Sequence, residues 1–437
     1  MSEEQLIVIG GGAAGMMAAG QAALMGVKVL LIEKKEVLGR KIAISGKGRC
    51  NLTNDENITE FIRRYPGNGR FLQGVLREFD NVRLRQFFVD LGVDTKVERG
   101  GRVFPISDDA QIVVKALEKF LLKAEVKVRT SNTVEEILAE KGQVKGIRLA
   151  CGENIPARAV IVCTGGASYP ATGSTGDGFR FASKLGHQVV TPRPALVPLC
   201  TSEPWVKEVQ GLALRNVEAS LWFDGKKRAS EFGELLFTHF GVSGPIILTL
   251  SRLACEALSQ GHTVRLEINL KPALTTDQLD LRLQRDFQVF SNKQFKNSLG
   301  ELLPKSLIPV IIKLSGINPD QVMHQINREE RKQLGQLLRR LSLTVTSTLP
   351  LAAAIVTAGG VEVKEINPKT MASKIVEGLY WAGEVVDVDG VTGGYNLQAA
   401  FAMGYRAGRA AAFQRSEIRS QRSEVIAEVR SRRSDRG

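Results

Sequence analysis

Leu6-Ile-Val-Ile-Gly10-Gly-Gly12-Ala-Ala-Gly15 lies near the start of the chain and joins an apolar tetrapeptide to a glycine turn. Such an apolar run is typical of a strand buried on both faces of a parallel sheet. In the spacing of the glycines, Gly10 permits a tight turn, Gly12 lets the backbone approach a pyrophosphate, and Gly15 lets helix and strand pack closely. The small residues through Ala23 predict that helix, whose N-terminus attracts phosphate. The pattern therefore predicts a dinucleotide-binding turn.

An acidic residue follows the next predicted strand, as such a site requires. The run 27–32 predicts that strand, and Glu33 follows Gly15 by 33 − 15 = 18 residues. At this place a carboxylate accepts both ribose hydroxyls of an adenosine. We expect Ala13 and Ala14 at the helix start and Lys34 beside the acid to contact the cofactor as well. A merely structural glycine-rich turn explains the glycines but not the strand, helix and acid together.

The far end of the chain distinguishes a flavin from a nicotinamide cofactor. Leu379-Tyr-Trp-Ala-Gly383-Glu384 predicts a strand closed by glycine and an acid, and a glycine-rich loop over 387–398 leads into a helix of small residues. An extended flavin needs an acid for its ribityl hydroxyls and a second helix N-terminus facing the ring edge that becomes negative on reduction. We therefore predict non-covalent FAD. The expected contacts here are Gly383, Glu384, Asp389, Gly393, Gly394, Asn396 and Leu397.

Four longer segments resemble those of a known family. They are Gly39-Arg-Lys-Ile-Ala-Ile-Ser-Gly-Lys-Gly-Arg-Cys-Asn-Leu-Thr-Asn54, Thr164-Gly-Gly-Ala-Ser-Tyr-Pro-Ala-Thr-Gly-Ser-Thr-Gly-Asp-Gly178, Phe237-Thr-His-Phe-Gly-Val-Ser-Gly-Pro245 and Gly383-Glu with Gly393-Gly-Tyr-Asn-Leu-Gln398. The chain resembles bacterial NAD(P)/FAD-dependent oxidoreductases of the BaiN/RdsA type up to about residue 412. The family includes members that reduce ribosomal RNA uridine, members that reduce bile-acid-type enes, and amine oxidases. The resemblance therefore implies the cofactor more firmly than the substrate.

The resemblance implies an α/β fold: a discontinuous, glutathione-reductase-like FAD-binding Rossmann domain with an inserted β-rich domain and a small helical domain. From the changes in the strand and helix patterns along the sequence we expect the FAD-binding domain over 1–191 and 345–414. The β-rich insertion, a substrate domain, is expected over 192–273 and the helical insertion over 274–344. The Arg-rich tail, 415–437, is expected to be disordered.

Segment 39–54 supplies candidate residues for the cofactor and for catalysis. Its cations include Arg40, Lys41 and Arg49, which could meet pyrophosphate, and Ser45 belongs to a glycine-containing loop able to lie along a flavin. Cys50 is either a proton donor to a substrate carbon or a small buried residue packed on the flavin. Three residues are named as catalytic candidates: Cys50, Asn51 and Tyr395. Thr164, Gly165 and Val134 complete the expected cofactor contacts.

Composition limits the remaining possibilities. The 437 residues hold 59 Lys and Arg against 46 Asp and Glu, a net charge of +13 that favours a polyanionic partner. Five scattered cysteines and four histidines predict neither a disulfide framework nor a metal site. The acidic start and the lack of a long apolar run predict a cytoplasmic protein without a transmembrane segment. The sequence does not indicate an oligomeric state.

Reduction of an activated C=C bond is the expected reaction, with uridine in ribosomal RNA as the leading substrate. The sequence has no second strand-GxGxxG-helix unit. We therefore expect NAD(P)H to act as electron donor without a Rossmann domain of its own. Two alternatives stay open at this point. One is a small-molecule flavoenzyme, an ene reductase or amine oxidase, and the other is a non-enzymatic flavin sensor.

Overall fold

The computed structural model describes residues 6–413, which divide into two compact units. The first unit contains residues 6–193 and 356–413, and the second is Pro194–Ile355. The chain thus leaves the first unit close to the expected boundary at 191 but returns to it at Val356 rather than at 345. The reason is β17 (Leu341–Thr348), which pairs with two strands of the second unit. The expected tail, 415–437, lies outside the described residues.

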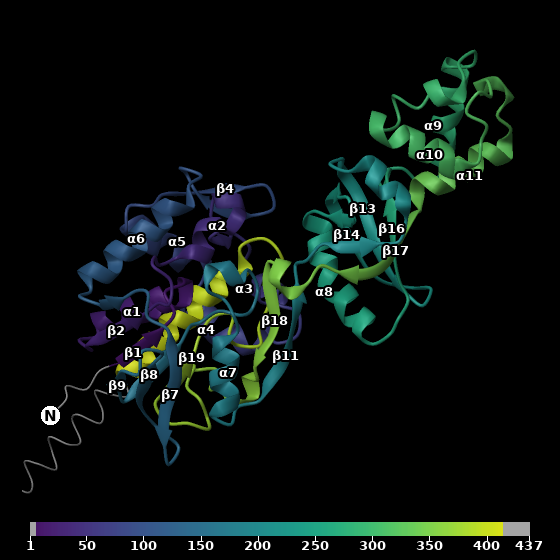
Figure 1. Cartoon of the computed structure of the whole chain (residues 1–437). Coiled ribbons are helices and arrows are strands. Elements are labelled where there is room, and N and C mark those ends of the chain that lie inside the picture. The colour runs from purple at the N-terminus through teal and green to yellow at the C-terminus, as the bar shows by residue number, and fades with distance from the viewer. Residues whose placement is uncertain (1–5, 414–437) are drawn as a thin grey trace, which may run out of the picture. The chain divides into compact units, whose positions relative to one another are not determined.

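A five-stranded parallel sheet forms the centre of the first unit (Figure 1). Its order is β19-β10-β1-β2-β6, with β19 (Leu379–Trp381), β10 (Ala159–Val162), β1 (Leu6–Ile9), β2 (Val29–Ile32) and β6 (Lys127–Arg129). All four pairings are parallel. Both faces of β1, β2, β10 and β19 are buried, which explains their uninterrupted apolar sequences. The predicted α/β class with a parallel sheet is confirmed.

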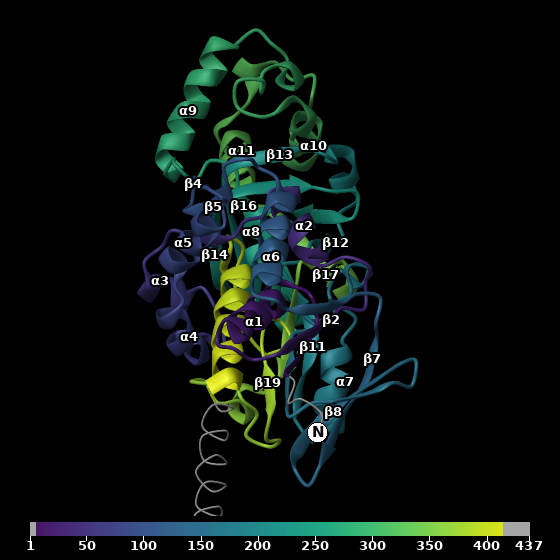
Figure 2. The ribbon, with the colours of Figure 1, turned by 90° about the vertical axis from the view of Figure 1, so that its left-hand side faces the viewer.

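Two helices from opposite ends of the chain pack tightly against each other beside this sheet. They are α1 (Ala13–Leu24) and the helix over 395–413, drawn in yellow next to α1 in Figure 2. A Cβ on Gly404 would lie 2.3 Å from the Ala14 carbonyl oxygen, and one on Gly408 would lie 2.2 Å from that of Ala18. Only glycine permits backbones to come this close.

Smaller elements surround the central sheet of the first unit. The helices are α2 (Arg40–Gly48), α3 (Ile58–Arg63), α4 (Gln73–Glu78), α5 (Asn81–Asp90), α6 (Ala110–Lys123) and α7 (Asp177–Lys184). One small sheet has the order β3-β5-β4 (Thr53–Asn54, Arg102–Pro105, Thr95–Glu98), and a second has β7-β8-β9 (Val134–Glu140, Gln143–Leu149, Asn154–Pro156). A third pairs β11 (Val189–Ala195) with β18 (Val356–Val361).

The second unit combines a closed six-stranded barrel with helices. The strand order is β12-β15-β14-β13-β16-β17, with β12 (Leu199–Thr201), β15 (Gly241–Ser243), β14 (Lys226–Phe237), β13 (Ala213–Phe223) and β16 (Val264–Asn269). Its helices are α8 (Pro245–Ser259), α9 (Thr276–Val289), α10 (Ile308–Ser315) and α11 (Arg328–Arg339). One buried apolar cluster runs through the barrel and these helices. The barrel leaves no open sheet edge.

Candidate functional site

The glycine turn before α1 has one open position. A Cβ on Gly10 would lie 2.4 Å from the Cys163 carbonyl oxygen, and one on Gly15 would lie 1.8 Å from that of Gly10. Around Gly12, by contrast, a Cβ would meet no atom within 4 Å. Gly12 is also the N-cap of α1, and no side chain caps this helix. The N–H groups of the first turn therefore face free space, as an anion site at a helix N-terminus requires.

The carboxylate of Glu33 is fixed at the end of β2. Its Oε2 accepts from the Gly11 N–H at 2.7 Å, and its Oε1 accepts from the Lys35 N–H at 2.8 Å. Because each carboxylate oxygen has two acceptor positions, both keep one for another donor. The Asn132 N–H donates to the Glu33 carbonyl at 3.1 Å, which brings the buried Val134 at the start of β7 into the same region.

Lys34 and Lys41 are paired within the protein, in two different networks. Lys34 Nζ lies 2.6 Å from Asp177 Oδ2, at the start of α7. Lys41 Nζ donates to Glu384 Oε2 at 2.5 Å and to Ser168 Oγ at 2.7 Å. The Lys41 pair joins residues 343 positions apart in the chain. Lys41 thereby connects the start of α2 with the segment after β19.

Glu384 is the centre of a half-buried polar cluster. Its Oε1 accepts from the Thr357 N–H at 2.7 Å and from Ser168 Oγ at 3.0 Å. Burial alone would raise the pKa of the carboxyl, but Lys41, the Thr357 N–H and Ser168 outweigh burial and hold that pKa below its ordinary value. With three donors on the carboxylate, about one acceptor position remains for a ligand hydroxyl. Glu384 is therefore a rigidly oriented anion.

The loop over 390–396 is closed by its own side chain. Asn396 Nδ2 donates to the Gly390 carbonyl and its Oδ1 accepts from the Gly390 N–H, both at 2.8 Å. The following helix begins at 395. A Cβ on Gly394 would lie 2.3 Å from the Thr53 carbonyl oxygen, so the loop packs against β3. Gly393 and Gly394 have φ of 128° and 101°, which favours glycine.

Asn51 connects this loop to β3 and β5. In the amide orientation that satisfies its neighbours, Nδ2 donates to the carbonyls of Thr53 and Val103 at 3.0 and 3.1 Å. The Oδ1 atom accepts from the Gly394 N–H at 3.1 Å. The amide is thus occupied by backbone groups and joins the loop to β3 and β5.

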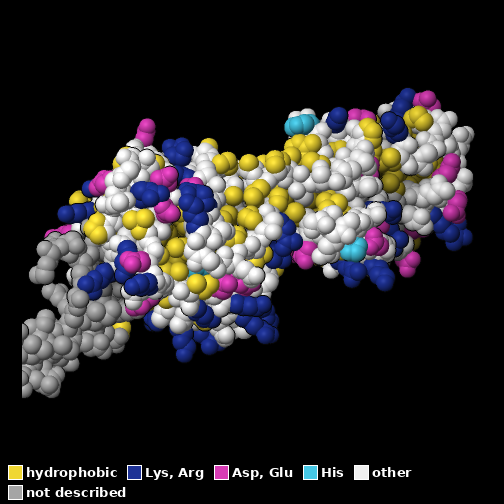
Figure 3. All heavy atoms as spheres, turned by 60° about the horizontal axis from the view of Figure 1, so that its bottom comes forward, with side chains coloured by type: hydrophobic (Ala, Val, Ile, Leu, Met, Phe, Trp, Pro, Cys, Tyr) yellow, Lys and Arg dark blue, Asp and Glu magenta, His cyan; other side chains and the backbone are white. Residues whose placement is uncertain are grey.

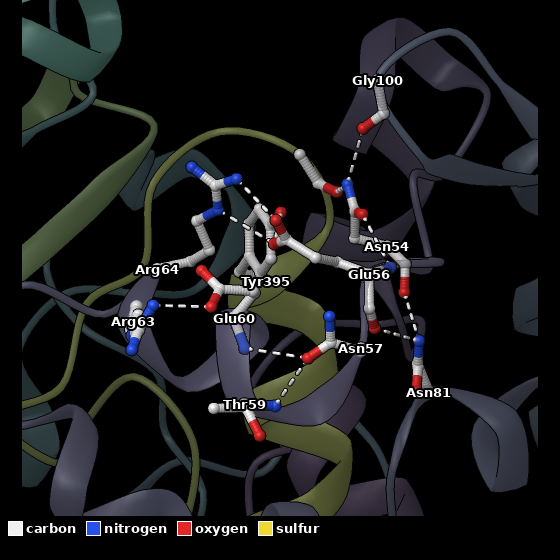
Figure 4. A network of polar contacts seen from close by, with 11 residues as sticks. Asn54, Glu56, Asn57, Thr59, Glu60, Arg63, Arg64, Asn81, Gly100 and Tyr395 are labelled. Atoms are coloured by element: carbon white, nitrogen blue, oxygen red, sulfur yellow. Dashed lines mark hydrogen bonds and ion pairs between the residues drawn. The ribbon is translucent and has the colours of Figure 1, made fainter.

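Tyr395 lies in the network of polar contacts shown in Figure 4. Its hydroxyl donates to Glu56 Oε2 at 2.9 Å, and Arg64 binds the same carboxylate through two hydrogen bonds of 2.9 and 2.6 Å. Arg64 lowers the pKa of Glu56, whereas burial and the Glu56 charge raise the pKa of Tyr395. The Tyr65 hydroxyl donates to the Tyr395 carbonyl at 2.8 Å. Tyr395 is therefore a protonated, buried phenol held by a carboxylate.

Cys50 is fully buried, and its backbone is in the left-handed region. Its side chain is 0% exposed and its φ is 60°, while its N–H donates to the Ser45 carbonyl at 3.0 Å. Burial raises the pKa of the thiol to about 12, and a hydrogen bond with Ser45 offsets only part of this effect. Cys50 therefore stays a neutral thiol near pH 7. This burial fits the interpretation of Cys50 as a small packed residue.

Arg49 points its charge toward the protein's own carboxylates. It makes hydrogen bonds with Glu98 and Asp108, and its guanidinium lies over the Phe104 ring at 4.2 Å from the centroid. These contacts engage the guanidinium of Arg49, which was predicted to bind the pyrophosphate of the cofactor. Arg40, at the start of α2, is exposed. Of the two arginines predicted to contact the cofactor, Arg40 is exposed and Arg49 is paired with carboxylates of the protein.

Three of the other predicted positions, Thr164, Gly165 and Gly383, directly follow strands of the central sheet. Thr164 and Gly165 follow β10, and a Cβ on Gly165 would lie 2.7 Å from Ser174 Oγ. Gly383, after β19, would place a Cβ 3.0 Å from that of Ala14 in α1. Asp389 is 3% exposed, and Leu397 is half-buried. The carboxyl ends of parallel strands are where ligands bind in this class of sheet.

Sequence reasoning missed the partners of the predicted residues. Ser168 lies in the glycine-rich segment 164–178, and its hydroxyl, which can donate a hydrogen bond to a carboxylate, could have marked it as a site residue. Thr357, Glu56 and Arg64 carried no such signal, because they reach the site only through tertiary packing. Within residues 6–413, no group of three or more His, Cys, Asp or Glu side chains could hold a metal ion. In the same range, no helix is long and apolar enough to cross a membrane.

Comparisons with known proteins agree with this geometry. The family described as "HI0933-like protein Rossmann domain" matches residues 4–410. The 3-dehydro-bile acid delta(4,6)-reductase of Clostridium scindens is 35% identical over 409 residues, 93% of this chain and 98% of that protein. The ribosomal RNA dihydrouridine synthase of Haemophilus influenzae is 32% identical over 414 residues, 91% of this chain and 96% of that protein.

A solved structure shows the same fold at low identity. The 3-ketosteroid-delta4-(5alpha)-dehydrogenase of Rhodococcus jostii matches with a TM-score of 0.52 and 16% identity, covering 94% of this chain and 97% of that chain. The parallel sheet, its glycine turn and Glu33 place the protein in the Rossmann class. The chain belongs to the HI0933-like family, and the resemblance to the BaiN/RdsA type is confirmed. It is an oxidoreductase.

Proposed function

We propose that the protein binds FAD and reduces an activated C=C bond, with uridine of ribosomal RNA as the leading substrate. The observation that carries the cofactor is the open N-terminus of α1 beside two oriented carboxylates. Free space lies at Gly12, and Glu33 keeps acceptor positions for ribose hydroxyls. Glu384 keeps one position beside its three donors. These features fit a long anionic dinucleotide.

Each part of FAD has residues suited to hold it. The N–H groups of Gly12, Ala13 and Ala14 suit the pyrophosphate, Glu33 suits the adenosine ribose, and Val134 gives the adenine an apolar neighbour. Glu384 suits a ribityl hydroxyl, and the helix N-terminus at 395 suits the polar ring edge. When bound, FAD supplies hydride transfer, and the protein supplies orientation and charge.

Cys50 and Tyr395 are the two candidates for delivering a proton to the substrate. Burial keeps the Cys50 thiol protonated, so this group can hold a proton near neutral pH. Tyr395 is also protonated, but its hydroxyl is committed to Glu56. The complete burial of Cys50 fits a small residue packed on the flavin, so we assign the proton-donor role to neither Cys50 nor Tyr395. Asn51 and Tyr395 then act by holding the loop over 390–396 and its helix.

The choice of substrate rests on the relatives and on surface charge. The names of both relatives describe the reduction of a C=C bond, one in a bile acid and one in a uridine of RNA. On the face shown in Figure 3, Lys and Arg side chains are spread among acidic ones. From Lys271 to Arg340, twelve Lys and Arg against seven Asp and Glu leave 12 − 7 = +5. This excess supports a polyanionic substrate.

Among the cations of α11 and the following Arg340, some are paired within the fold and others are exposed. Arg331 binds Asp280 at 2.8 Å, and Arg339 donates to the Leu274 carbonyl at 2.9 Å, so both stabilise the fold. Arg328, Lys332 and Arg340 are exposed. These three are the residues to neutralise, because their loss leaves the helix packing intact.

The test combines RNA chemistry with salt dependence. Mass spectrometry should find less dihydrouridine in ribosomal RNA from cells lacking the protein. Neutralising Arg328, Lys332 and Arg340 should weaken RNA binding and flatten its log–log salt slope by roughly 0.7–0.9 per lost phosphate contact. Exchanging three exposed lysines of α6 for Gln is the matched control for lost charge, with the substitutions at Lys115, Lys119 and Lys123. Unchanged RNA modification would overturn the RNA substrate.

A small-molecule substrate is the second candidate, favoured by the bile-acid reductase being 35% identical. In that case the reduction rate should not depend on RNA, and the charge variants should behave as wild type.

We also propose NAD(P)H as the electron donor. Anaerobic reduction of the bound flavin by NADH or NADPH, followed by the loss of flavin absorbance, tests the donor separately.

A further inference from the structure

Tyr169 is a bulky residue in a conformation that L-residues avoid. Its φ and ψ are 50° and 60°, in the left-handed region. It also precedes Pro170, and a residue before proline is normally extended. The Thr172 N–H and hydroxyl hold this geometry by donating to the Tyr169 carbonyl at 2.8 and 2.7 Å. Glycine would take this backbone with less strain.

The side chain of Tyr169 makes no hydrogen bond, aromatic contact or cation–π contact within the described part of the chain. It is 37% exposed, and neither its ring nor its hydroxyl makes a contact of the kinds that Tyr65 and Tyr395 make. The rest of its surface is covered by packing, but no side-chain hydrogen bond or ring contact inside the described chain offsets the backbone strain. The strain therefore points to a role outside the folded chain.

The position of the loop shows where that role lies. Ser168, immediately before Tyr169, donates to Glu384 at 3.0 Å. Gly173, four residues later, would place a Cβ 3.7 Å from Glu33 Oε1. The segment from Tyr169 to Thr172 thus runs between the two carboxylates of the candidate site, all within the first unit. Tyr169, next to Ser168, is at the Glu384 end of this segment and thus beside the place proposed for the ribityl chain.

We propose that Tyr169 is a stacking platform for a flat heteroaromatic ring of the reaction partner. This inference rests on the proposed function and names a contact within it. A phenol ring stacks on any base or on a nicotinamide, because each has a π-face, whereas an aliphatic ring system gains only apolar contact. The two sources of such a ring are the target base of RNA and the nicotinamide of the electron donor.

Three variants separate the ring from the backbone strain. Tyr169→Gly removes both, Tyr169→Leu keeps the bulk and the strain without a π-face, and Tyr169→Phe keeps the ring. Flavin content, melting temperature, the dissociation constant for ribosomal RNA and the constant for NADH or NADPH in flavin reduction are measured for each. We expect Tyr169→Gly to retain flavin and to melt no lower than wild type.

For one of the two partners, the dissociation constant of Tyr169→Gly should rise about 5- to 150-fold, as base–aromatic stacking predicts. Tyr169→Leu should show most of that loss, and Tyr169→Phe little. A rise with RNA alone identifies the base, and a rise with the nicotinamide donor alone identifies the donor. Wild-type constants for both partners in Tyr169→Gly would overturn the proposal, as would loss of flavin. If the wild-type protein contains no flavin, the proposed function is refuted instead. The dissociation constants of the Tyr169 variants for RNA would still test the stacking contact in that case.

Discussion

Replacing Gly12 by Val separates cofactor binding from folding. Gly12 has φ of −85° and ψ of −167°, which any L-residue can adopt, and a Cβ there would meet no protein atom within 4 Å. The folded chain should therefore accept the side chain. The cost is limited to the weaker N-cap, about 1 kcal/mol. A bound pyrophosphate would meet the same side chain directly.

The expected loss of FAD affinity follows from the hydrogen bonds displaced. A hydrogen bond to a charged group contributes roughly 1.5–3 kcal/mol. Losing two of them at the start of α1 corresponds to roughly 3–6 kcal/mol, or about a 10²- to 10⁴-fold rise in the FAD dissociation constant. The melting temperature of the flavin-free protein should fall by only about 2–4 °C.

The assay is a titration of flavin-free protein followed by quenching of FAD fluorescence, with thermal melting of the same samples. Gly300→Val is the matched control, because Gly300 has equally open surroundings and lies in the second unit. Gly15→Val should instead disrupt folding, since a Cβ there would lie 1.8 Å from the Gly10 carbonyl oxygen. A folded Gly12→Val protein with wild-type FAD affinity would refute the placement of the phosphate site.

Three further outcomes are expected. Glu33→Ala should raise the FAD dissociation constant about 10- to 150-fold by titration, because a charge-assisted hydrogen bond is lost, and an unchanged constant would move the ribose partner elsewhere. Lys41→Met should lower the free energy of unfolding in urea by on the order of 2 kcal/mol, because Glu384 loses its cation. Adding Glu384→Gln to this variant should restore much of the lost stability, whereas additive losses from the two substitutions would contradict the pairing. His187 lies shortly after α7, with Nδ1 3.1 Å from Glu365 Oε2 and Nε2 2.9 Å from Ser373 Oγ. Burial lowers the pKa of His187 despite the Glu365 charge. The unfolded chain therefore binds more protons below about pH 6.5, so wild type should lose stability on acidification more steeply than His187→Gln, and parallel pH profiles would exclude this.

The local part of the fold could be predicted from the sequence. The strand over 6–9, the glycine turn and the strand before Glu33 are encoded by neighbouring residues, because apolar runs and glycine spacing act over short distances. The site's long-range pairs could not be predicted in this way. Tyr395 meets Glu56 across 339 positions and Lys41 meets Glu384 across 343, and neither pair has a local signal.

Charge and domain boundaries show a second limit of sequence reasoning. Arg49 belongs to a cationic segment, yet its charge is paired with Glu98 and Asp108, which are 49 and 59 positions away in the sequence. β17 follows a helical stretch and precedes the return to the first unit, so its sequence fits either unit. Only its pairing with β16 and β12 assigns it to the barrel.

The discontinuity of the first unit has a consequence for biosynthesis. Its central sheet needs β19, and its α1 needs the helix over 395–413, so neither is complete until nearly the whole described chain has left the ribosome. The second unit is a single continuous stretch, Pro194–Ile355, and all its strands are available earlier. Domains fold as units during synthesis, usually from the N-terminus onward. Here the order is reversed: the inserted barrel can mature while the nascent first unit still exposes strand β10, the future neighbour of β19, to chaperones.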